Sequence, residues 1–221
     1  MADDGTAGDD WAGLNALSDP VRRRLYEYVA AHDTPVRREE AAASVGISRT
    51  LAAYHLDRLA DAGLLATSYA RPAGRGGPGA GRPAKHYERT QDEVAVTVPP
   101  RTYGLLAQLL AAAVAQDRTG EVTSALMEAA AEEGRAAGAE GTDLLTSLRV
   151  RGYEPVVGTD GDIDLRNCPF HQLAQQQTEL VCQLNHALLR GCLAGRDEDP
   201  RRADLHPRPG RCCVVIHPAD H

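Results

Sequence analysis

Residues 46–63 read GISRTLAAYHLDRLADAG, and this stretch decides the fold of the N-terminal half. Gly46 ends a short helical pattern over residues 36–45, and Ser48 is a favourable N-cap for the next helix. We therefore expect a helix over residues 49–62, which Gly63 closes. Two helices joined by a tight turn with a glycine have the spacing of a helix-turn-helix motif.

The flanking sequence extends this motif on both sides. Upstream, a helix in two parts is expected over about residues 11–31, with Ser18 as the cap before the second part. Downstream, strands are expected over residues 64–69 and 84–89, around a Gly/Pro-rich loop that carries three arginines and no acid. A hairpin directly after the third helix predicts a wing. The alternative is a disordered linker, but a linker would not need flanking strands.

The third helix has two distinct faces. Ala52, Leu56 and Leu59 lie on one stripe with Leu64 and are expected to pack inward. Short side chains near the N-terminus of the other face, together with Arg and Tyr, suit a helix that enters a major groove. An ordinary amphipathic surface helix is the alternative. The expected DNA contacts are Ser48, Arg49, Thr50, Ala53, Tyr54, His55 and Arg58 on the helix, and Arg71, Arg75, Arg82 and Lys85 on the hairpin.

The charge distribution agrees with this division. The chain has 221 residues and a net charge of −7, but residues 19–90 carry twelve basic and eight acidic side chains, a net +4. Residues 91–221 are net −7, and residues 1–18 hold four acids and no base. A basic module on an acidic body is typical of a phosphate-contacting domain with a separate regulatory half.

The N-terminal pattern also resembles a known family. The segments LSDPVRRRLYEYV, VRREEAAASVGISRTLAAYHLDRLADAGLL and GRPAKHYE are similar to the winged-helix module of ArsR/DeoR-like bacterial regulators, over roughly residues 14–90. The resemblance implies binding to a double-stranded DNA operator as a homodimer. The matching motif positions are Ser48, Thr50, His55 and Leu56 in the recognition helix, and Gly81, Arg82, Pro83 and Tyr87 in the wing.

The second half is predicted to be an α+β domain. Its leucine stripe between residues 101 and 116 could form a dimer contact or an internal core. The chain as a whole is expected to be α+β and mainly α, with a winged helix-turn-helix followed by a sensor and dimerisation domain. The expected parts are a disordered acidic tail (1–10), the DNA-binding domain (11–92) and the sensor domain (98–221), which contains helices at about 101–116, 121–137, 142–151 and 171–193, a hairpin at 155–165 and a last strand at 212–216.

All five cysteines fall in the last quarter of the chain. Clustered cysteines in a reducing cytoplasm more often bind metal or sense redox state than form structural disulfides. Adjacent strand residues project to opposite faces, so Cys212 and Cys213 are not expected to ligate one centre together. Three interpretations stay open: an iron–sulfur cluster, a zinc site, or small buried hydrophobic side chains. The candidate ligands are Cys168, Cys182, Cys212, Cys213 and His171, with Cys192 ranked lower.

A second resemblance bears on these cysteines. The segments LRNCPFHQLAQQQTELVCQLNHALLRG and PRPGRCCVVI are similar to the C-terminal part of SufR-type iron–sulfur-responsive repressors, a branch of the same regulators. The resemblance implies that Cys168, Cys182 and Cys212 or Cys213 hold a cluster that controls DNA affinity.

Other functions are less well supported by the sequence. The GRGGPGAG run lacks the lysine of a phosphate-binding loop and opens no helix, so an enzyme is not expected. No apolar run has the length of a membrane span and the first residues are acidic, which predicts a cytoplasmic protein. The alternative within the regulator class is a winged-helix protein with zinc or without metal, controlled by a small ligand or a partner.

Overall fold

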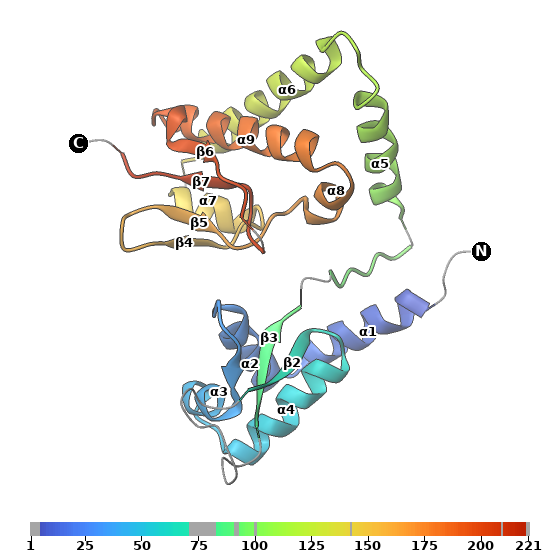
Figure 1. Ribbon diagram of the computed structural model, residues 1–221, viewed down its shortest axis with the longest axis vertical. Helices are drawn as coiled ribbons and strands as arrows, with labels where there is room; N and C mark the ends of the chain where they lie inside the picture. Colours follow the sequence, from blue (N-terminus) through green and yellow to red (C-terminus); the bar gives the residue numbers. More distant parts are fainter. Residues whose placement is uncertain are drawn as a thin grey trace. The chain divides into compact units, whose positions relative to one another are not determined.

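The computed structural model describes residues 5–70, 83–90, 93–99, 101–141, 143–208 and 210–219, with side chains from residue 10 onward. The chain divides into two compact units, Met1–Arg101 and Thr102–His221 (Figure 1). The fold is mixed α+β and mainly helical, which confirms the predicted fold class.

The first unit contains a helical layer and a small sheet. Strand β3 lies in the middle of an antiparallel sheet with the order β1-β3-β2, so Tyr87 stands opposite Val36 on one side and Thr67 on the other. The predicted hairpin is the β2–β3 pair. The elements in chain order are α1 (Gly5–Ser18), α2 (Pro20–Ala30), β1 (Val36–Arg37), α3 (Arg38–Val45), α4 (Arg49–Asp61), β2 (Leu65–Ala70) and β3 (Ala84–Arg89).

Local capping explains where these helices begin. The Ser48 hydroxyl accepts a hydrogen bond from the Leu51 backbone N–H at 3.2 Å, as its position before α4 predicts. Gly46, at φ 74°, ends α3 in the left-handed region that glycine tolerates. The cap of α2 is Asp19 and not the predicted Ser18, because Asp19 accepts from two backbone N–H groups while Pro20 occupies the first helical position.

Helix α1 extends into the segment that was predicted to be a disordered tail. It begins at Gly5, whereas disorder was expected over residues 1–10; residues 1–4 lie outside the described part of the chain. Once a helix has formed from Trp11 onward, each residue added at its N-terminus gains a backbone hydrogen bond without a new nucleation cost. A prediction of disorder from amino-acid composition does not take this cooperative gain in helix stability into account.

The core of the first unit joins α2, α4 and β3. Leu25, Val29, Leu56, Leu59 and Tyr87 are each no more than 1% exposed. These side chains belong to one cluster, and the inward stripe predicted for the third helix lies in it. Burial of this stripe sets which face of α4 points outward.

The second unit packs helices against a four-stranded antiparallel sheet with the order β4-β5-β7-β6. The long helix predicted over residues 171–193 is interrupted at Gln177, whose φ of −133° and ψ of 55° are not helical. The last strand begins at Val214, two residues later than predicted. The elements are α5 (Tyr103–Val114), α6 (Glu121–Gly138), α7 (Leu144–Val150), β4 (Pro155–Val157), β5 (Ile163–Leu165), α8 (His171–Gln176), α9 (Thr178–Ala194), the 3-10 turn η1 (Pro200–Arg202), β6 (Ala203–Leu205) and β7 (Val214–Ile216).

Helices α6 and α9 lie side by side in unusually close contact (Figure 1). A Cβ on Gly191 would overlap the carbonyl oxygen of Ala131, and one on Gly134 would overlap the carbonyl oxygen of Leu188. Gly138 and Gly195 face the opposite backbone in the same way. These four glycines let two helix backbones approach to a distance that any side chain would prevent.

We therefore expect Gly191→Ala to destabilise the second unit by about 1–3 kcal/mol, the usual cost of overpacking. Urea unfolding of the full chain, followed by circular dichroism, measures this loss. Gly104→Ala is the matched control, because a Cβ at Gly104 in α5 meets open space and alanine favours a helix over glycine. Equal stabilities of the two variants would contradict the close-packing account.

Helix α5 presents apolar side chains to solvent. Tyr103, Leu105, Leu106, Leu109 and Leu110 are between 54% and 71% exposed, whereas Ala111 is buried. The twelve residues of α5 include no charged side chain. The predicted leucine stripe is thus not covered by the other described residues of the second unit.

Candidate nucleic-acid interface and cysteine pocket

Helix α4 has one buried face and one exposed face. Ala52, His55, Leu56 and Leu59 are buried against the rest of the first unit. Thr50, Leu51, Tyr54 and Arg58 are exposed and recur at helical spacings of one, three and four residues, so they share one side of the helix. We call these four residues the open face of α4.

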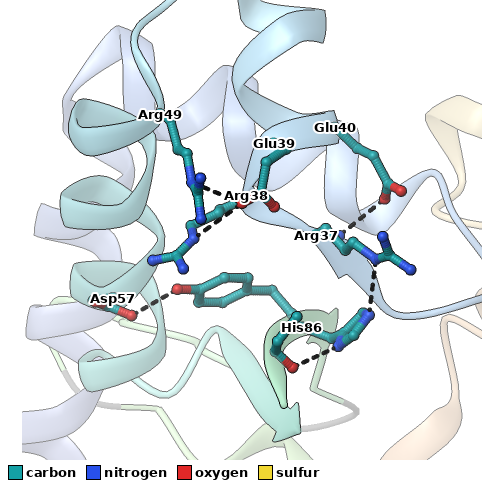
Figure 2. Close-up of polar contacts among 9 residues, drawn as sticks. Arg37, Arg38, Glu39, Glu40, Arg49, Asp57 and His86 are labelled. Atoms are coloured by element: carbon teal, nitrogen blue, oxygen red, sulfur yellow. Dashed lines mark hydrogen bonds and ion pairs between the residues drawn. The ribbon is translucent and has the colours of Figure 1, made fainter. Parts of the chain in front are cut away.

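Ion pairs of Arg49 and Asp57 tie α4 to its neighbours, and Figure 2 shows the contacts of Arg49 with Glu39. Arg49 Nε lies 2.7 Å from Glu39 Oε1 on α3, and Arg38 Nε lies 3.4 Å from the same oxygen. Asp57 Oδ1 accepts hydrogen bonds from Lys85 Nζ at 2.6 Å and from the Tyr87 hydroxyl at 2.8 Å, both on β3. These contacts set the rotation of α4 about its own axis.

Two residues predicted as DNA contacts, Arg49 and Lys85, therefore have partners within the protein. The Arg49 side chain is 62% exposed, and an exposed pair of this kind contributes little to stability, so it can exchange Glu39 for a phosphate at small cost. Lys85 is only 26% exposed and is held more firmly by Asp57. Lys85 acts first as a structural residue that orients α4.

His55 does not lie on the exposed face, in contrast to its predicted place among the DNA contacts. It is 8% exposed, and its Nδ1 has no hydrogen-bond partner among the described residues. His55 is three residues after Ala52 and four before Leu59, so helical spacing places it on the buried stripe. That spacing was available in the sequence.

The remaining predicted contacts fall into three groups. Ser48, Thr50, Tyr54 and Arg58 are exposed, and Ala53 is half-buried. The wing arginines Arg71, Arg75 and Arg82 lie outside the described residues. Leu51, which is 42% exposed, was not predicted, although its spacing of three and seven residues from Tyr54 and Arg58 indicated the open face.

Asp57 is the electrostatic centre of this arrangement. Partial burial acts to raise the pKa of its carboxyl group, but the hydrogen bonds from Lys85 and Tyr87 outweigh this effect and hold the pKa below its ordinary value. The pKa of Tyr87 is raised by burial and by the Asp57 carboxylate. The ionised form of Asp57 is therefore the one that the fold favours.

Three of the five cysteines line one cavity of ≈ 200 Å³ in the second unit. Four of the five predicted ligands, Cys168, His171, Cys182 and Cys213, line it. They come from three segments: the start of α8 and the residue shortly before it, helix α9, and the residue before β7. The other lining residues are Ala174, Gln175, Thr178, Pro207, Arg208 and Arg211.

Cys212 projects away from the cavity wall into the core. It is 2% exposed, and its Sγ accepts a hydrogen bond from Asn185 Nδ2 at 3.0 Å, while Asn185 Oδ1 accepts one from the Tyr153 hydroxyl at 2.6 Å. Cys213 therefore lines the cavity and Cys212 does not, although the Cys212 thiol interacts with the side chains of Cys168 and Cys213. Cys192 is buried in α9 against α6 and does not line the cavity.

The thiols of Cys168 and Cys212 are held in the neutral form, because the pKa of each is raised. A hydrogen bond with Cys212 and burial both raise the pKa of Cys168. The hydrogen bond from Cys168 lowers the pKa of Cys212, but the interaction with Cys213 and burial prevail and raise it to about 11. Among the described residues, no three His, Cys, Asp or Glu side chains are arranged closely enough to hold a metal ion.

Comparison with known proteins bears on the first unit. A family model described as a helix-turn-helix domain matches residues 17–68, from the end of α1 into β2. No curated protein and no solved structure is significantly similar to the chain. No helix of the described residues has the length and hydropathy required to cross a membrane. The matched region contains α4 and its whole open face, so the chain carries a helix-turn-helix domain, which is typical of DNA-binding transcriptional regulators.

The contacts of Asp57 predict a pH-dependent stability. Because the pKa of Asp57 is lowered in the folded state, its contribution is present above the ordinary aspartate pKa of about 3.9 and is lost as the pH falls through the lower folded value. We expect Asp57→Asn to be less stable than the wild type at pH 6, with a smaller difference at pH 3. Urea unfolding at the two pH values measures this, and exposed Asp61→Asn is the control. A difference that grew in acid would contradict the assignment.

Proposed function

We propose that this protein is a DNA-binding transcriptional regulator, with a repressor as the expected type, that binds a double-stranded operator as a homodimer. Its operator affinity would be controlled by an iron–sulfur cluster or a metal ion bound by the C-terminal cysteines. The observation that carries the DNA-binding part is the open face of α4 within the matched helix-turn-helix domain.

The chemistry of the open face suits a major groove. Thr50 offers a hydroxyl group that can donate to or accept from a base edge, and Arg58 offers a guanidinium that can contact guanine or phosphate. The first turn of α4 carries no acidic side chain, so the positive end of the helix dipole is available to a phosphate. Arg38 and Arg49 on the flank add positive charge beside this face.

We expect Arg58→Ala to weaken binding to a selected operator by roughly five- to a hundredfold, the range for loss of one good base or phosphate contact. The operator is obtained by selection from a random duplex pool, and fluorescence anisotropy measures the affinity at fixed salt, since salt alone changes it. The control is Arg149→Ala, which removes one positive charge from an exposed position in the second unit, outside α4. Equal effects of the two changes would remove α4 as the binding element.

A second copy of the chain is the proposed occupant of the exposed apolar face of α5. Five large apolar side chains on a helix without charge form a patch that a monomer rarely leaves in water. Two-half-site operators require two recognition helices at a fixed spacing of about 34 Å, and a symmetric pair of chains supplies them.

Sedimentation velocity tests this dimer. The wild type is expected to sediment as a dimer, and the double change Leu106→Asp and Leu109→Asp is expected to give a monomer because it buries charge in the contact. Val150→Asp changes an exposed apolar residue of α7 and should leave the dimer intact. A monomeric wild type, or a double variant that stays dimeric, would exclude α5 as the interface.

The donor set around the cysteine cavity suits a soft metal centre. Three thiols and one imidazole from separate segments line it, and such ligands suit both iron–sulfur clusters and zinc. A bound cluster or zinc ion would supply the positive charge that makes thiolates favourable where thiols are otherwise neutral. Cys168, Cys182, Cys213 and His171 would hold it, and they would have to come closer together to do so, because no three such side chains are grouped closely enough among the described residues.

These ligands could add a direct link between the three segments that carry them. Cys168 follows β5, Cys182 lies in α9, and Cys213 precedes β7. Arg208 and Arg211 pair with Asp164 on β5 and hold the loop that carries Cys213 against the sheet. Joining these segments would change the shape of the second unit and, in a dimer, the spacing of the two α4 helices. Coupling of about 1–3 kcal/mol would suffice for regulation.

Anaerobic purification with iron, sulfide and zinc analysis tests the cofactor. We expect iron and sulfide in the wild type, their loss in Cys168→Ser and Cys182→Ser, and their retention in Cys192→Ser, which alters a buried cysteine away from the cavity. Operator affinity is measured before and after oxidation. Zinc without sulfide would support the zinc alternative, and metal-free protein with normal DNA binding would support control by a small ligand or partner.

A further inference from the structure

The open face of α4 includes two large apolar side chains that the described residues of the first unit do not cover. Leu51 is 42% exposed and Tyr54 is 58% exposed, and on α4, whose residues are all described, they are the large apolar side chains that face water. They are three residues apart, so their side chains are neighbours on the helix surface.

Leu51 is not part of the hydrophobic core of the first unit. Ala52, Leu56 and Leu59 are fully buried and fill the inner face of α4. The backbone at Leu51 is fixed by the Ser48 cap, whose hydroxyl accepts the Leu51 N–H. A single exposed leucine is ordinary on a protein surface. Leu51 differs in its neighbours, because it shares the open face of α4 with Thr50 and Arg58, and this face lies within the matched helix-turn-helix domain.

In the major groove, the edges of the base pairs offer only one apolar group that a leucine side chain can contact. Guanine, cytosine and adenine present hydrogen-bonding atoms there, whereas thymine adds its 5-methyl group. Leucine cannot donate or accept a hydrogen bond, so it would leave a polar edge without a partner. It gains by covering a methyl group.

We propose that Leu51, with Tyr54 beside it, contacts the 5-methyl group of a thymine and so selects thymine at one fixed position in each operator half-site. This inference rests on the proposed DNA binding and adds a specificity determinant to it. The basic side chains around the open face, Arg38, Arg49 and Arg58, favour a polyanion over an apolar protein surface as the occupant.

Deoxyuridine substitution tests this contact directly, because deoxyuridine keeps the hydrogen-bonding groups of thymine and lacks only the methyl. Each thymine of the selected operator is replaced in turn, and the affinity of the full-length chain is measured. We expect one position per half-site at which the replacement weakens binding about fourfold, as burial of a single methyl group predicts.

Leu51→Ala completes a double-mutant cycle. This variant should lose a similar factor on the thymine duplex and no further affinity on the deoxyuridine duplex. Val150→Ala, an exposed apolar residue of α7, should keep the full deoxyuridine penalty. Alanine is a good helix former at this exposed position, so the variant folds.

The outcomes separate this inference from the proposed function. Failure of the wild type to select any duplex would overturn both. Selective binding that Arg58→Ala weakens, but that no deoxyuridine changes, overturns the thymine contact alone. A deoxyuridine penalty that persists unchanged in Leu51→Ala also overturns it, as does a Leu51→Ala variant that loses its dimer instead of its thymine preference.

Discussion

The hydrogen bonds that Asp57 accepts from Lys85 and Tyr87 hold helix α4 against strand β3. These hydrogen bonds and the buried side chains of Leu56 and Leu59 fix the orientation of α4 about its own axis. That orientation decides which side chains point into solvent and which enter the core. The open face, and every contact proposed for it, depends on this constraint.

The same constraint separates residues that act on DNA from residues that position them. Lys85 carries a charge that could contact phosphate, but its charge is used within the protein to hold Asp57. Arg49 has an exposed pair with Glu39 and can release it at small cost. The open face itself is mixed, with a hydroxyl, a guanidinium and two apolar groups. Such a mixture can distinguish bases, whereas a uniformly basic surface would mainly bind phosphate.

Much of the first unit could be predicted because its signals are local. Ser48, Gly46 and Gly63 mark helix ends within a few residues, so the bounds of α4 agree with those predicted to within one residue. The hairpin followed from two strand-like segments that flank the glycine-rich loop directly after the third helix. His55 was misplaced because motif resemblance was given more weight than helical spacing, which puts His55 beside Ala52 and Leu59 on the buried stripe.

The second unit was harder to predict because its shape depends on distant partners. Strand β6 is three residues long and pairs only with β7, so nothing local indicated it. The break at Gln177 lies in a stretch without a glycine or proline that would have predicted it. The candidate ligands were identified by residue type, but the division between Cys213 on the cavity wall and Cys212 in the core required the fold. Hydroxyl-radical footprinting of the full chain, with and without the selected duplex, tests the central claim most directly. The account predicts that Tyr54 becomes protected while Tyr103 on α5 keeps its reactivity; an unchanged Tyr54 in the bound complex would contradict it.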